Sequence, residues 1–98
     1  MGLTHGDRKE LESLINAAIR DPKMPVGLAQ KMIPRQGSVD DFAYGLISGM
    51  VIGNFIAVFQ NKNRRQPDKD EITDLLSIMM TKMPRLRKAI MTELDIHY

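Results

Sequence analysis

A stretch of 18 residues, from position 42 to position 59, contains no charged residue and constrains the fold more than any other part of the chain. It is too long for a β-strand, which usually has about 5–6 residues, and it shows no alternation of apolar and polar residues. Asp40 and Asp41 precede it and suit the positive end of a helix dipole. Because Ser38 and Asp41 also resemble a capping box, we expect a helix over about 39–61.

Three glycines interrupt this stretch at every fourth position, namely Gly45, Gly49 and Gly53. Each glycine costs a helix about 1 kcal/mol relative to alanine. On a helix, their spacing places them in one strip that has no side chains, which allows the backbone of another helix to approach closely. We therefore expect this glycine strip to be a surface for helix packing, either within the chain or between two copies of it.

Two environments suit a long helix without charges. One is the centre of a helical bundle, where neighbouring helices cover it on every side. The other is a lipid bilayer, because 18 residues at a rise of 1.5 Å span about 27 Å, close to the thickness of the hydrocarbon core. Ser48 and Asn54 lie within the stretch, and the rest of the chain has amphipathic helical patterns that need a partner, so we favour the bundle. A single membrane span over 42–59 is the alternative.

Amphipathic patterns predict shorter helices before this stretch. Asp7 followed by Glu10 matches a capping box, and apolar residues then recur at helical spacing over 8–20. Prolines enclose a further short helix at about 26–33. Its expected buried residues are Val26, Leu28, Ala29, Met32 and Ile33.

The C-terminal third repeats apolar residues at intervals of four and three, which is typical of a helix-packing seam. Pro84 interrupts the pattern, because a proline removes one backbone hydrogen bond and clashes with the preceding turn of a helix. We expect two helices here, at about 69–82 and 84–95, or one helix that is kinked near Pro84.

Together these patterns predict a single all-α domain over residues 1–98, built as a bundle of four to five helices around the helix at 39–61. Residues 1–6 and 96–98 are expected to fray. Aromatic residues make up only 5% of the chain and there are eight methionines, so the core is expected to be mainly aliphatic.

Residues for catalysis or metal binding are scarce. The chain has no cysteine, and its two histidines, His5 and His97, lie near opposite termini. A zinc site needs three or four protein ligands, and a nucleophile needs a base beside it. We therefore expect no enzyme activity, no cofactor and no metal. The lack of cysteine also agrees with a reducing compartment, so we expect a cytoplasmic protein, with a membrane location as the alternative.

Two basic clusters are candidates for contact with an anion or a nucleic acid. The first follows the charge-free stretch, and the second surrounds Pro84, where no acidic residue occurs between Asp74 and Glu93. Such clusters can hold a phosphate backbone, although an ordinary solvated face has the same composition. The clusters comprise Lys62, Arg64, Arg65, Lys82, Arg85, Arg87 and Lys88.

The function that we expect is that of a non-catalytic helical module for protein–protein interaction, as a homodimer or as a small subunit or adaptor of a larger assembly. The glycine strip and a methionine-rich C-terminal surface would form the interface, since methionine suits pliant contact surfaces. The methionines of this surface are Met79, Met80 and Met83. A single-pass membrane protein is the first alternative, and a nucleic-acid-associated accessory protein that uses the basic clusters is the second.

Overall fold

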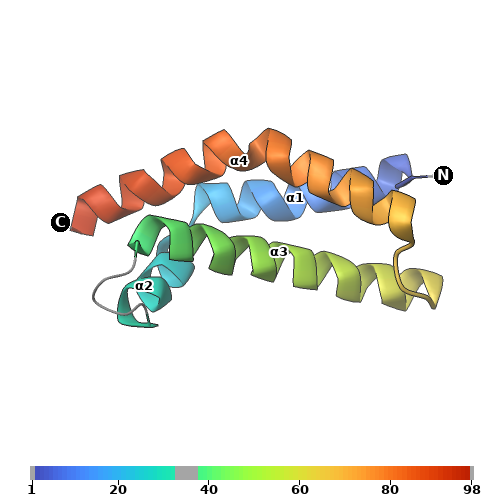
Figure 1. Ribbon diagram of the computed structural model, residues 1–98, viewed down its shortest axis with the longest axis horizontal. Coiled ribbons are helices and arrows are strands. Elements are labelled where there is room, and N and C mark those ends of the chain that lie inside the picture. The colour runs from blue at the N-terminus through green and yellow to red at the C-terminus, as the bar shows by residue number, and fades with distance from the viewer. Residues whose placement is uncertain (1, 33–37, 98) are drawn as a thin grey trace.

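The computed structural model describes residues 2–32 and 38–97, and this part of the chain forms four α-helices without a β-strand. The helices are α1 (His5–Arg20), α2 (Lys23–Met32), α3 (Val39–Asn63) and α4 (Lys69–His97). Three of them, α1, α3 and α4, run along the long axis of the molecule, with α3 antiparallel to the other two, while the short α2 lies at one end (Figure 1). The predicted all-α bundle is therefore confirmed.

The long central helix, α3, begins at Val39 as predicted and extends to Asn63 rather than ending near residue 61. Ser38 is its N-cap, since its side-chain oxygen accepts a hydrogen bond from the N–H of Asp41 at 3.5 Å. Every fourth residue of α3 is buried, and these residues form one ridge against which the other helices pack. The ridge consists of Ala43, Ile47, Val51, Phe55 and Phe59.

The opposite side of α3 is exposed among the described residues. Gly45, Gly49 and Gly53 are all exposed, and a Cβ atom added to any of them would meet no neighbouring atom within 4 Å. Only 28% of the most apolar 18-residue window of α3 is buried. The expectation that helices of the same chain cover this helix on every side is therefore wrong, because the ridge on one face already engages α1, α2 and α4.

The start of α1 also differs from the prediction. Thr4, not Asp7, is the N-cap: the N–H of Asp7 donates to the Thr4 hydroxyl at 3.1 Å, and the N–H of Thr4 donates to the Asp7 carboxylate at 3.3 Å. Leu3 is buried, and its N–H donates to the Asp74 carboxylate at 2.9 Å. Fraying of residues 1–6 is expected from the sequence, whereas Leu3 and Thr4 make these specific contacts and His5 and Gly6 belong to the first turn of α1. Tyr98 lies outside the described residues.

The two proline-containing segments are more helical than predicted. The helix α2 begins at Lys23, and Pro25 lies in its first turn, where a backbone N–H has no partner within the helix. The helix α4 is continuous through Pro84, so the expected break into two helices is wrong, and it arches along its length (Figure 1). Pro84 and Met80 are exposed, so water can hydrate the Met80 carbonyl that lacks a donor. A kink at Pro84 stays a prediction.

The residue that ends α3 adopts an unusual backbone conformation. Arg64 has φ 59° and ψ 31°, in the left-handed region, and its N–H donates to the carbonyl of Gln60 at 2.8 Å. This conformation costs an ordinary L-residue about 1–2 kcal/mol and costs glycine almost nothing. The side chain of Arg64 is exposed and forms no hydrogen bond or ion pair with the described residues.

We predict that Arg64→Gly stabilises the fold by about 0.5–1 kcal/mol, because the relief of the left-handed conformation exceeds the extra entropy that glycine gives the unfolded chain. Urea denaturation followed by circular dichroism measures this as a higher midpoint. The control is Arg64→Ala, which removes the same side chain but keeps the Cβ atom and should leave the midpoint nearly unchanged. Equal midpoints for the two variants would contradict the argument.

Candidate interaction surfaces

The exposed side of α3 is an apolar surface that carries no charge between positions 42 and 59. The glycine strip continues into Ala57, which is also exposed and again follows at a spacing of four. Met50 and Val58, one residue further round the helix, have 38% and 42% of their surface exposed. We call this surface, from Gly45 to Val58, the α3 outer face.

An apolar groove of about 310 Å³ adjoins the α3 outer face at Met50. The walls of this groove come from three helices, since α1 contributes Ala17 and Ala18 and the first turn of α2 contributes Met24. Its floor includes Ile47 and Val51 of the buried ridge. The groove therefore extends the apolar surface of α3 across to α1 and α2.

The expected methionine surface of α4 is split by the structure. Met79 belongs to the core with 6% of its surface exposed, and Met83 is partly buried. Met80 points outward with 66% exposed. Because adjacent positions on a helix point in different directions, Met79 and Met80 cannot share one face.

The sequence prediction missed a second exposed apolar row, on α2. Met24, Leu28 and Met32 follow one another at a spacing of four, and each is exposed. Leu28 and Met32 are expected from the sequence to be buried, but Val26 and Ala29 form the buried side of this helix instead. Both rows of apolar residues have helical spacing, so the sequence does not show which row is buried. The position of α3 decides it. The expected burial of Ile33 concerns a residue outside the described part.

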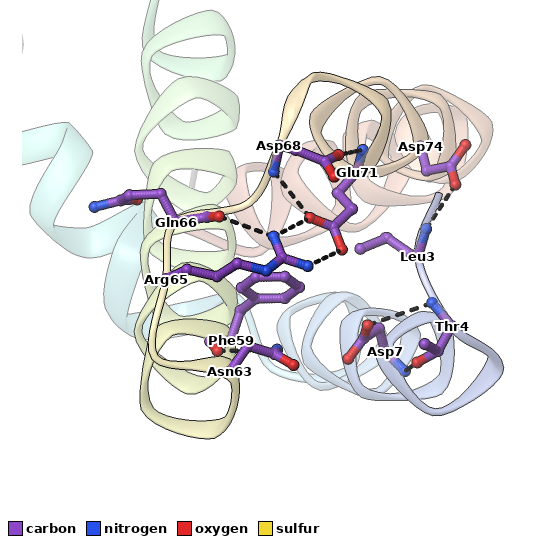
Figure 2. A network of polar contacts seen from close by, with 10 residues as sticks. All are labelled: Leu3, Thr4, Asp7, Phe59, Asn63, Arg65, Gln66, Asp68, Glu71 and Asp74. Atoms are coloured by element: carbon purple, nitrogen blue, oxygen red, sulfur yellow. Dashed lines mark hydrogen bonds and ion pairs between the residues drawn. The ribbon is translucent and has the colours of Figure 1, made fainter. Parts of the chain in front are cut away.

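The first basic cluster is largely engaged inside the fold. Arg65 binds Glu71 through two hydrogen bonds of 2.7 Å and 3.0 Å, and its guanidinium lies 5.1 Å from the centre of the Phe59 ring (Figure 2). Lys62 donates a hydrogen bond to the buried carboxylate of Asp7. These contacts join the end of α3 to the starts of α4 and α1, so both cations hold the bundle together.

Glu71 is the centre of this network. Besides Arg65, it accepts a hydrogen bond from the N–H of Asp68 at 2.8 Å, and its own N–H donates to Asp68 at 2.9 Å (Figure 2). The hydrogen bonds from Arg65, followed by that from the Asp68 backbone, lower the pKa of Glu71 from 4.5 to about 2. For Asp7, burial favours a higher pKa, but the hydrogen bonds from Lys62 and Thr4 outweigh it and leave the pKa below its ordinary value.

The second basic cluster is divided between two sides of α4. Arg87 contacts Asp41 of α3 at 2.9 Å, and its guanidinium lies 4.5 Å from the centre of the Tyr44 ring. Lys82 lies 3.9 Å from Glu12 of α1. Arg85 and Lys88 instead line open hollows between α1 and α4, where Arg20 of α1 joins them. Arg20 was not among the sequence candidates, because its position before Asp21-Pro22 identifies it only as a helix end.

The comparisons with known proteins add no function. No family model matches the chain, and neither the curated proteins nor the solved structures contain a significant match. Within the described residues, no group of three or more histidine, cysteine, aspartate or glutamate side chains is arranged to hold a metal ion. The function is therefore inferred from the exposed surfaces alone.

The low pKa of Glu71 predicts how its network depends on pH. A carboxylate whose pKa is lower in the folded state stabilises the fold above its unfolded pKa, here near 4.5, and loses this contribution as the pH falls toward 2. We expect Glu71→Gln to lower the urea midpoint at pH 7, and the difference from the wild type to shrink steadily between pH 4.5 and 2.

Glu10→Gln is the matched control, because Glu10 is a glutamate exposed on α1, away from the Glu71 network. Its midpoint should differ little from that of the wild type across the same range. A Glu71→Gln difference that stays constant from pH 7 to pH 2 would show that the ionised carboxylate does not carry the stabilisation.

Proposed function

We propose that the protein is a non-catalytic helical interaction module that forms a homodimer through the α3 outer face. One observation carries this proposal: a helix with 18 consecutive uncharged residues buries only one residue in four and leaves its glycine side exposed. The glycines lower helix stability by about 1 kcal/mol each, yet no helix of the described chain uses the space that they create. A partner helix is what would use it.

A second copy of the chain suits this face because the two ends of α3 carry opposite charges. Asp40 lies at the start of the helix, and Arg64, which forms no ion pair with the described residues, lies at its end, whereas Asp41 and Lys62 are already paired within the fold. In an antiparallel pair around a two-fold axis, each acidic end points toward the basic end of the partner, while a parallel pair would bring like charges together. Residues at a spacing of four form an inclined ridge, so two such helices are expected to cross at about −40° to −50°.

Apolar residues beside the glycine strip enlarge the surface that is available to the proposed dimer interface. A stable protein–protein interface buries about 800 Å² on each partner, which is more than a row of glycines supplies. Met50, Val58 and the adjoining groove at Ala17, Ala18 and Met24 extend the apolar surface around the strip. In the proposed dimer, the flexible side chain of Met50 from each copy would fill part of the groove of the other.

A membrane span is the second candidate, since α3 is the one helix of the described chain that is long and apolar enough to cross a bilayer. The packing of the other helices favours association in water instead. Charged pairs such as Arg8–Asp74 and Lys82–Glu12 lie on α1 and α4, which run beside α3 over much of its length. Placing α3 in a bilayer in this fold would carry those charges to membrane depth, where each is costly.

We predict that Gly49→Leu weakens dimerisation by about tenfold or more, because the side chain holds the two α3 backbones apart. The same change should leave the monomer folded and slightly more stable, since the site is open and leucine is a better helix former than glycine. Sedimentation equilibrium in detergent-free buffer measures the first effect, and thermal unfolding followed by circular dichroism measures the second.

Thr73→Leu is the matched control, because it adds an exposed leucine to α4, away from the α3 outer face. It should leave the dimer unchanged. A monomeric wild type at high protein concentration, or a Gly49→Leu dimer of unchanged affinity, would refute the proposed interface. A protein that stays in solution only with detergent would instead support the membrane span.

A further inference from the structure

An open trough runs between α1 and α4. It consists of two adjoining hollows of about 680 Å³ and 460 Å³, which share Ile19, Arg20 and Arg85. The first hollow reaches back along α1 to His5 and Lys9, and the second continues along α4 to Lys88 and Thr92. We call this surface the α1–α4 trough.

Positive charge exceeds negative charge in the α1–α4 trough. Arg20, Arg85 and Lys88 form no ion pair or hydrogen bond through their side chains with the described residues, unlike Lys62 and Arg65 at the other basic cluster. Like charges that share a hollow repel one another, and a bound anion relieves this repulsion.

The acidic residues of the trough leave its surface positive. Glu12 lies 3.9 Å from Lys82, so its charge is already matched. Glu93 also lines the second hollow with only 5% of its surface exposed, and Arg20, Arg85 and Lys88 outnumber this one carboxylate there. Lys9 adds a further exposed cation at the far end. The charge that a ligand meets in this trough is therefore cationic.

We infer that the α1–α4 trough binds the phosphodiester backbone of a nucleic acid. The trough is long and open: α1 alone extends about 22 Å from His5 to Arg20 at 1.5 Å per residue, which suits an extended polyanion better than a small enclosed anion. Arg20, Arg85 and Lys88 cluster where the two hollows meet, and Lys9 lies toward the other end of α1, so a backbone laid along the trough contacts these cations in turn and each contact releases counterions.

The lining also defines the mode of binding. Among the described residues, His5 at the far end of the first hollow is the only ring in the lining, and no Phe, Tyr or Trp lines either hollow, so the trough offers no row of rings on which successive unpaired bases can stack. Contacts to phosphates alone position a duplex without reading its sequence. The ligand is therefore a duplex bound through its backbone, with an affinity that does not depend on base sequence.

This site is independent of the proposed dimer. On α1, Leu11 and Ile15 point into the core, Ala17 and Ala18 line the apolar groove beside α3, and Arg20 faces the trough. The two surfaces thus lie on different sides of the same helix, and a monomer carries the trough as well as a dimer does.

Fluorescence anisotropy with labelled DNA duplexes of two unrelated sequences tests the inference over a series of salt concentrations. The site variant is Arg20→Gln/Arg85→Gln/Lys88→Gln. The control is Lys23→Gln/Lys31→Gln/Lys69→Gln, which removes the same charge from exposed positions outside the trough. We expect the site variant to bind about tenfold or more weaker than the control, and to reduce the slope of log K against log salt by about 2–3.

All six positions are on helix surfaces, and circular dichroism checks that both variants fold. Should the site variant prove unstable, the single variant Arg85→Glu against Lys69→Glu makes the same comparison. Equal losses in the site and control variants would overturn the inference, because binding would then reflect net charge alone. A wild type that ignores both duplexes but binds phosphatidylserine vesicles through the same residues would overturn it as well.

Discussion

The buried ridge of α3 is the constraint on which the rest of the structure depends. Phe55 and Phe59 are its two largest residues and form its C-terminal end, with ring centres 6.1 Å apart and planes inclined by 43°, and both are almost fully buried. Leu11 and Ile15 of α1 and Leu75 of α4 belong to the same hydrophobic core. Burial of each such side chain stabilises the fold by about 1.5–3 kcal/mol. Since one ridge receives three helices, the bundle is built on one side of α3, and its other side is left to solvent or to a partner.

The sequence predicts that the helices exist more reliably than it predicts the residues at which they begin and end. The charge-free stretch and the amphipathic patterns are local properties, so α1, α3 and α4 follow from spacing and length. The start of α1 does not, because Thr4–Asp7 and Asp7–Glu10 both fit a capping box. The choice between them depends on Leu3, which is buried, and on the contact of Asp7 with Lys62, 55 positions away in the chain. Likewise, the loss of one backbone hydrogen bond at Pro84 can be read from the sequence. Whether the helix continues through Pro84 depends on the position of this turn at the surface, which the sequence does not show.

The candidate surfaces were predictable only in part, for the same reason. The spacing of the glycines identifies the glycine strip, but only the packing shows that no helix of the described chain lies against it. The basic residues around Pro84 look equivalent in sequence, yet Arg87 reaches Asp41, 46 positions away, while Arg85 turns toward α1. Partners so distant in the chain leave no local signal. Arg20 gives no signal at all until α1 and α4 lie side by side.

The two surfaces that we propose to be functional lie on different sides of the bundle, because of the way in which α1 and α4 are oriented about their own axes. One side of the bundle presents an uncharged helix, and the α1–α4 trough presents cations without internal partners. An antiparallel dimer through α3 would leave the trough of each copy open, so one dimer would offer two cationic sites on a single body. Two linked sites bind a long polyanion more tightly than one, because the second contact becomes intramolecular. Self-association and backbone binding would then reinforce each other, although each rests on different residues.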